Sequence, residues 1–207
     1  MKPNVFLPAD NLLTDYMEAS AARHRHLCPR QVLGIRMGLY GLRCLGLVNL
    51  DFKTPYDNRR KRLLTVVETD GCGADGVAVA TDCYVGRRTL RVLDFGKMAA
   101  TMVDIQTGKA VRVVPHQESR QLARVHVPDA HSRWHAYLEA YQIIPDELLL
   151  TAREVLLTQS IAEILSRPTA RAECDDCGEE IINQREIKQD GRILCRTCAG
   201  DSYYCEL

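Results

Sequence analysis

A compact set of side chains able to bind metal or do thiol chemistry lies near the N-terminus, in the segment His24-Arg-His-Leu-Cys28-Pro29. A folded core could bring Cys72 and Cys83 to its two imidazoles and its thiol. Proline disfavours helix at the preceding residue and suits the first helical position. We therefore expect Cys28 to be the N-cap of a helix that begins at Pro29, where the positive helix end stabilises a thiolate.

The two histidines of this segment share a face only if the chain is extended between them. His24 and His26 are two positions apart, and side chains at that spacing point the same way in extended chain but not in a helix. Either imidazole could then act as the base or the fellow ligand of Cys28. The alternative is that one histidine caps the preceding helix, the other lies at the surface, and Cys28 is an inert buried thiol.

A second cysteine motif lies near the C-terminus, where Cys174-Asp-Asp-Cys177 and Cys195-Arg-Thr-Cys198 form two C-x-x-C pairs. Each pair can form a tight knuckle, and together they supply the four thiolates of a tetrahedral zinc site. Because protein sulfur would fill all four positions, no place remains for water or substrate. The motif predicts a structural zinc finger that folds only with its metal.

Hydrophobic periodicity predicts the elements that must position these residues. Apolar positions at helical spacing indicate a helix over 10–23 and another from Pro29, whose Gly34, Gly38 and Gly41 would let a second backbone approach closely. A valine- and leucine-rich strand over 61–69 is followed by a short helix over 74–81, with Cys72 at its start and Cys83 at its end. The further predictions are three antiparallel strands within 89–114 and a long helix over 145–165.

The stretch between the predicted strand and the short helix, Asp70-Gly-Cys-Gly-Ala-Asp-Gly76, contains G-x-G-x-x-G, with Asp94 after the next strand. This spacing is that of the dinucleotide-binding fingerprint. We discount it because Glu68 and Asp70 would place negative charge beside a pyrophosphate. The chain also lacks a repeating β-α-β pattern.

Composition indicates an ordinary globular chain, with 46% hydrophobic and 26% charged residues and a formal net charge of +0. Its length of 207 residues suits one domain over 1–168 and a small appendage over 169–207. An odd number of cysteines, 9, fits thiols in a reducing compartment better than disulfides. We find no apolar run of membrane-spanning length and no leader pattern, so we expect a cytoplasmic protein.

Several of these motifs together carry a family resemblance. The spaced set is His24-x-His26-x-Cys28-Pro, Gly34-Ile-Arg36-Met37, Cys72-x-x-Asp75 with Cys83, and Phe95-Gly-Lys97. It resembles the E-subunit family of formylmethanofuran dehydrogenase over most of residues 10–165. The C-terminal motif is similar to zinc fingers of the DksA/TraR or treble-clef kind, which some members of that family carry.

The resemblance implies an α+β core with an antiparallel sheet packed against helices, a tethered zinc finger, a homodimer, and association with molybdenum or tungsten formylmethanofuran dehydrogenase operons. It does not imply that this chain is the catalyst, because no iron–sulfur C-x₂-C-x₂-C-x₃-C run is present. Our first hypothesis is an accessory metal-binding protein with a second metal in the core. The core site would comprise His24, His26, Cys28, Cys72 and Cys83.

Within this hypothesis Cys28 is the nucleophile or soft ligand, and Cys72 is a ligand or resolving thiol. Asp75 and Lys97 would position the ligands or a substrate. If Cys28 and Cys72 meet, a reversible disulfide is as reasonable as a metal. A small zinc- or thiol-dependent enzyme using the same residues is the alternative.

A third class is a regulatory or partner-binding zinc-finger protein. Basic residues predominate between Arg23 and Arg62, whereas the finger carries Asp175, Asp176, Glu179 and Glu180. Acidic side chains oppose phosphate contact, so nucleic acid is not an expected partner of the finger. A protein partner, such as a formylmethanofuran dehydrogenase-type complex, fits these charges better.

Overall fold

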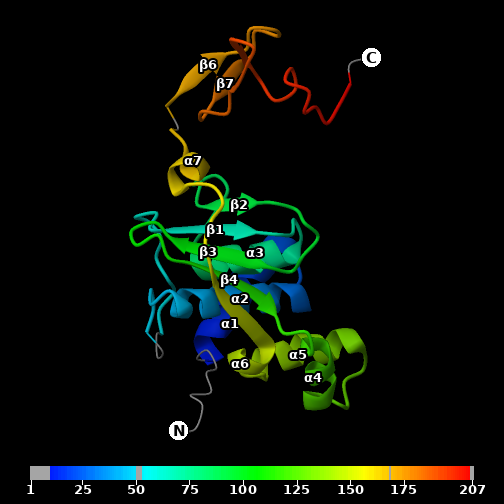
Figure 1. Ribbon diagram of the computed structural model, residues 1–207. Coiled ribbons are helices and arrows are strands. Elements are labelled where there is room, and N and C mark those ends of the chain that lie inside the picture. The colour runs from blue at the N-terminus through cyan, green and yellow to red at the C-terminus, as the bar shows by residue number, and fades with distance from the viewer. Residues whose placement is uncertain (1–9, 50–52, 168, 206–207) are drawn as a thin grey trace. The chain divides into compact units, whose positions relative to one another are not determined.

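The computed structural model describes residues 10–49, 53–167 and 169–205. The chain divides into two compact units between Leu157 and Thr158 (Figure 1). The boundary expected after residue 168 falls on a residue outside the described ranges. No helix in the described part of the chain has the length and hydropathy needed to cross a membrane.

The first unit contains the helices and strands that carry the candidate core site, together with those that complete its sheet and its outer helices. In chain order they are α1 (Asp10–His24), α2 (Pro29–Cys44), β1 (Leu63–Val67), α3 (Cys72–Thr81), β2 (Leu90–Val92), β3 (Ala100–Asp104), β4 (Ala110–Pro115), α4 (Ser119–His126), α5 (Arg133–Ile143), α6 (Asp146–Leu149) and β5 (Leu150–Val155).

One five-stranded sheet, in the order β2-β1-β3-β4-β5, organises the first unit. Its neighbours are antiparallel except for β2, which pairs in parallel with β1 because α3 returns the chain to the same end of the sheet. The register aligns Val67 with Ala100, Ala100 with Val113, and Val113 with Ala152. The α+β class is confirmed, with one parallel edge strand in place of a purely antiparallel meander.

The core lies between this sheet and the helices α2 and α3, which pack on one of its faces (Figure 1). Gly41 of α2 faces Met102 of β3, where an added Cβ would lie 2.2 Å from the sulfur. Farther toward the start of α2, an added Cβ on Gly34 would lie 2.3 Å from the Gly73 carbonyl oxygen. Glycine therefore lets the backbones of α2 and α3 approach closely at their N-terminal ends, as the sequence predicts.

This close approach supplies a first testable prediction. Replacing Gly34 by alanine should lower the free energy of unfolding by about 1–3 kcal/mol, because the obstructing atom belongs to backbone and cannot rotate away. Urea unfolding followed by circular dichroism measures the loss. The matched control is Gly86→Ala, where an added Cβ meets nothing within 4 Å. Equal behaviour of the two variants would contradict the account of the helix contact.

The predicted long helix over 145–165 is wrong. The chain instead forms the short helix α6, the strand β5, and a separate helix α7 (Ile161–Leu165) in the second unit. The apolar positions suit a helix, but β5 pairs with β4 along its whole length, from Leu150 beside Pro115 to Val155 beside Ala110. Leu156, a member of the predicted helical stripe, is 96% exposed. Pairing at the open sheet edge overrides the local pattern.

A buried ion-pair network fixes α2 to the segment that precedes β5. Arg36 and Asp146 are both 0% exposed, and the guanidinium donates to Asp146 Oδ1 from Nε (2.9 Å) and Nη2 (2.6 Å). Arg36 also donates to the carbonyls of Tyr141 (2.7 Å) and Ile144 (2.6 Å). Arg43 donates to the other carboxylate oxygen at 2.8 Å. The buried charges are thus paired and hydrogen-bonded, as burial requires.

The second unit contains α7 and two antiparallel hairpins. One pairs β6 (Arg171–Glu173) with β7 (Glu180–Ile182), and the other pairs β8 (Ile187–Gln189) with β9 (Arg192–Leu194). Its buried cluster among the described residues consists of Cys174, Ile181 and Leu194. So small an apolar core requires further stabilisation.

Candidate functional site

The start of α2 places Cys28 as the sequence predicts. Cys28 is the N-cap, with extended backbone angles (φ −128°, ψ 158°), and it is 8% exposed. Its backbone N–H donates to Gln31 Oε1 at 2.7 Å. The Gln31 amide in turn donates to the carbonyl and hydroxyl oxygens of Ser20, at 3.0 and 3.1 Å. These bonds tie α1 to the start of α2 and hold the Cys28 thiol in place.

Cys72 is the first residue of α3, and the α2–α3 contact brings its thiol to that of Cys28. Burial raises the pKa of Cys72, and the hydrogen-bonded Cys28 thiol raises it further, because two adjacent thiolates repel each other. Both cysteines are free thiols in the structure. The structure therefore brings together the two sulfur atoms that the sequence analysis singles out.

A second pair of donor groups lies one helical turn farther along α3. Asp75 lies three residues after Cys72, so the two side chains are neighbours on one face of the helix. His24, the last residue of α1, donates from Nε2 to Asp75 Oδ2 at 2.5 Å. The two side chains are 26% and 37% exposed. His26 is exposed and donates from Nδ1 to the His24 carbonyl oxygen at 3.0 Å.

The structure does not bring Cys83 to this group. Cys83 lies beyond the opposite end of α3, a helix of 10 residues, and its side chain is 0% exposed. Its sulfur accepts hydrogen bonds from Asn58 Nδ2 (3.3 Å) and Thr65 Oγ1 (3.4 Å). Burial raises the pKa of Cys83. These contacts make it part of the packing between α3 and β1.

Cys28 and Cys72 line a cavity of about 990 Å³ in the first unit. Lys97 lines it too, and its backbone N–H donates to the Glu68 carbonyl oxygen at 3.0 Å. The sequence analysis missed the other polar and aromatic residues of this wall. These are Arg30, Arg112, His116, Gln117, Ser119, Arg120, Trp134, Tyr137 and Tyr141. Arg30 alone had a usable signal, as a basic residue in a first helical turn where acids are favoured.

The glycine-rich stretch does form a β-α-β unit, since β1, α3 and the parallel strand β2 follow one another. Its glycines, however, are used in helix packing. An added Cβ on Gly76 would lie 2.2 Å from the Gln31 carbonyl oxygen, and one on Gly73 would lie 2.5 Å from the Met98 side chain. These contacts explain the spacing without a dinucleotide.

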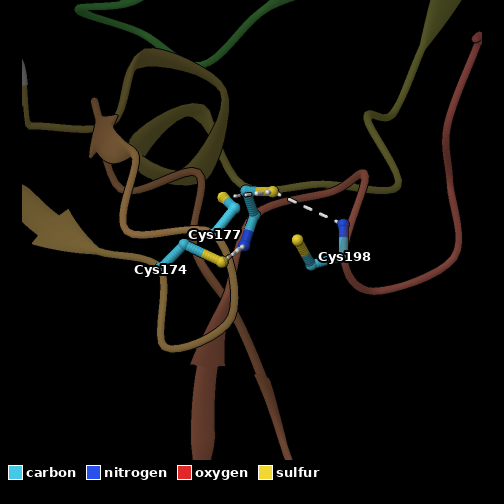
Figure 2. Close-up of side chains that lie close together, drawn as sticks. Cys174, Cys177 and Cys198 are labelled. Carbon is cyan, nitrogen blue, oxygen red and sulfur yellow. Dashed lines mark hydrogen bonds between the residues drawn. The ribbon is translucent and has the colours of Figure 1, made fainter. Parts of the chain in front are cut away.

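In the second unit, Cys174, Cys177, Cys195 and Cys198 form the one group of three or more His, Cys, Asp or Glu residues, among those described, whose ligand atoms all lie within 4.8 Å of one another. Figure 2 shows three of these side chains with their sulfur atoms turned toward a common centre. Zinc–sulfur bonds of ~2.3 Å in a tetrahedron place the sulfur atoms about 3.8 Å apart. The Cys177 and Cys195 sulfur atoms are 3.9 Å apart, so the cluster fits zinc.

Backbone N–H groups prepare these thiols for a metal. The N–H of Cys195 donates to Cys174 Sγ at 3.3 Å, and that of Cys198 donates to Cys195 Sγ at 3.4 Å. The N–H groups of Cys177 and Cys195 lower the pKa of Cys174 to about 7, because they stabilise its thiolate. Zinc binds thiolates, so this arrangement favours the metal-bound form.

The two units thus define a protein with a thiol-bearing α+β core and a zinc-finger unit. A family model described as "FmdE, Molybdenum formylmethanofuran dehydrogenase operon" matches residues 23–169, and the chain belongs to this FmdE family. A model of the prokaryotic dksA/traR C4-type zinc finger matches residues 167–204. The cysteine cluster and this match together support zinc binding by the second unit.

Two known proteins resemble the chain. The crystal structure of an FmdE-like protein of tungsten formylmethanofuran dehydrogenase from Syntrophus aciditrophicus has 22% identity and a TM-score of 0.59, and the match covers 93% of this chain and 95% of that one. It shows the same fold. A probable S-adenosyl-L-methionine-binding protein from Archaeoglobus fulgidus is 36% identical over 96 residues, or 46% of this chain. The matched part is only 25% of that relative's length.

Proposed function

We propose that this chain is an accessory metal-binding protein of the FmdE family, with one metal ion held in the core beside the cavity and a structural zinc in the finger. The observation that carries the core site is the arrangement of two donor pairs on one face of α3. Cys72 contacts Cys28, and Asp75 contacts His24. A cation between the pairs would satisfy groups that otherwise crowd negative charge together.

The chemistry of these donors suits zinc or a similar borderline metal, which takes thiolate and imidazole ligands. The bond from His24 Nε2 to Asp75 supports a ligand role, because carboxylates commonly orient a metal-binding histidine and leave its other ring nitrogen free. In the part of the chain that the structure describes, three core donors do not all lie within 4.8 Å of one another. Side-chain rotation would therefore accompany metal binding.

The contact between Cys28 and Cys72 favours a second candidate, a reversible disulfide. In that reaction the two thiols lose two protons and two electrons to a disulfide-bearing partner, which is reduced to two thiols. The position of both sulfur atoms on the cavity wall would also serve a small thiol- or zinc-dependent enzyme, because a substrate has room there. As macromolecular partners we propose a second copy of the chain and a formylmethanofuran dehydrogenase-type complex.

Elemental analysis of protein purified without added metal tests the first candidate. We expect about two metal ions per chain, one held by the core and one by the finger. Cys28→Ala should lose the core ion and Cys174→Ala the finger ion. The matched control is Cys44→Ala, an exposed cysteine at the far end of α2, which should lose neither.

The same variants separate the candidates. If Cys28→Ala keeps all the metal of the wild-type chain, the core metal site is refuted. Treatment with oxidised glutathione then tests the second candidate by thiol counting and mass spectrometry. A Cys28–Cys72 disulfide that dithiothreitol reverses would support it, and persistence of both free thiols would exclude it.

A further inference from the structure

We propose that the cavity beside Cys28 and Cys72 binds a nucleoside phosphate, with the phosphate at a cluster of helix N-termini and the base against exposed aromatic rings. The inference goes beyond the proposed function, because the groups that carry it are distinct from the metal and thiol donors. It rests on the backbone, the charges and the aromatic side chains of the cavity wall.

The N-terminal ends of four helices contribute to this wall. Pro29 and Arg30 begin α2, Cys72 begins α3, Ser119 and Arg120 begin α4, and Trp134 is the second residue of α5. Each helix N-terminus carries partial positive charge and unsatisfied N–H groups, which makes it a site for phosphate. First turns usually carry acids, yet those of α2, α4 and α5 carry none. The positive ends are therefore left for an external anion.

Side-chain charge acts in the same direction. Arg30, Lys97, Arg112 and Arg120 line the cavity, and among the described residues no aspartate or glutamate does. Arg112 is committed to Glu68 through bonds of 2.6 and 2.7 Å.

The other three cations are less committed. Within the described ranges, no carboxylate lies within salt-bridge distance of Arg30, Lys97 or Arg120, and all three are exposed. Glu118, the N-cap of α4, lines a neighbouring cavity instead. The wall is therefore positively charged where it meets solvent.

Aromatic rings give the cavity its second chemical character. Trp134 is 44% exposed and lines it together with Tyr137, whose ring stacks on Tyr141 with centroids 5.8 Å apart and planes inclined by 5°. Exposed indole and phenol rings provide stacking surfaces for a planar base. A volume of about 990 Å³ is far larger than inorganic phosphate needs. The combination of anion site and ring site selects a nucleoside phosphate over a bare anion.

Trp134 is the single tryptophan of the chain, so intrinsic fluorescence reports on this cavity directly. We expect AMP or GMP to quench it saturably in the full-length protein, with a dissociation constant that rises with salt. Adenosine should bind at least about tenfold more weakly, because it lacks the charge. Inorganic phosphate should compete with AMP without saturating quenching of its own.

Substitutions locate the site. Arg30→Ala and Arg120→Ala should each weaken AMP binding about tenfold or more, because each removes a charge-assisted bond to phosphate. The matched control Arg124→Ala removes an exposed arginine of the same helix that does not line this cavity, and should change affinity less than about twofold. Circular dichroism checks that each variant is folded. Calorimetry on Trp134→Phe, which keeps a ring, should give nearly the wild-type affinity.

Three results would overturn the proposal. The first is that AMP, GMP, CMP and UMP at millimolar concentration give neither quenching nor heat. The second is that adenosine binds as tightly as AMP, which would mean that the cavity selects a ring without a phosphate. The third is that Arg124→Ala weakens binding as much as Arg120→Ala, which would indicate general surface charge. Because none of these readouts involves Cys28 or Cys72, they are independent of the metal experiment.

Discussion

Removal of zinc should unfold the second unit while the first unit stays folded. The described apolar core of this unit is Cys174, Ile181 and Leu194, and two of its hairpin strands, β8 and β9, are only three residues long. Structural zinc contributes roughly 10–16 kcal/mol in zinc-finger peptides, far more than so small a core supplies. Cys174→Ser or a strong chelator should therefore abolish protection of the amides in 171–198 from hydrogen exchange.

Hydrogen exchange on the full-length chain makes the comparison within one sample. Amides of β1, β3 and β4 should keep their protection, because they belong to the core of the first unit. Cys205→Ser is the control, since Cys205 is an exposed thiol outside the four-cysteine group. Protection of 171–198 that survives chelation would show that the hairpins fold without metal.

Replacement of Asp146 by alanine should lower the free energy of unfolding by about 3–5 kcal/mol. Arg36 would then hold a guanidinium that is 0% exposed with no carboxylate beside it, and Arg43 would lose its bond to the same side chain. The loss reflects an uncompensated buried charge more than the net value of the ion pair. Urea unfolding followed by circular dichroism measures it.

Two further variants test that cause. Glu147→Ala removes the adjacent, exposed carboxylate, whose distance to Arg43 is 3.6 Å, and should cost at most about 1 kcal/mol. The double variant Arg36→Met with Asp146→Leu removes both charges and should recover much of the loss. If the double variant is as unstable as the two single losses combined, the buried-charge explanation is wrong.

Local signals in the sequence predicted the elements around the candidate site well. The Cys-Pro step placed the start of α2, and glycines at 34, 38 and 41 predicted a close neighbouring backbone, which proved to be α3. The two C-x-x-C pairs predicted the four-cysteine cluster, because the spacing alone builds the knuckles. In each case the determining interactions span few residues or depend on one backbone contact.

Features set by distant contacts were not predictable in the same way. Leu150 to Val155 carry a pattern that suits a helix, and only the open edge of β4 makes them a strand. Arg36 appeared in a family motif, but nothing in its neighbourhood indicated that its partner would be Asp146. The basic cavity is similar, since Arg30, Lys97 and Arg120 come from separate elements that only the fold brings together.

The bond between Arg36 and Asp146 joins positions 110 residues apart, and this separation affects how the protein is made. A ribosome releases α2 long before it synthesises the carboxylate that neutralises Arg36. Until then the guanidinium must stay in water, because burial without a partner is strongly unfavourable. The nascent chain therefore cannot complete its core around α2 until residues through Asp146 have emerged, and folding of the first unit is confined to the last part of its synthesis.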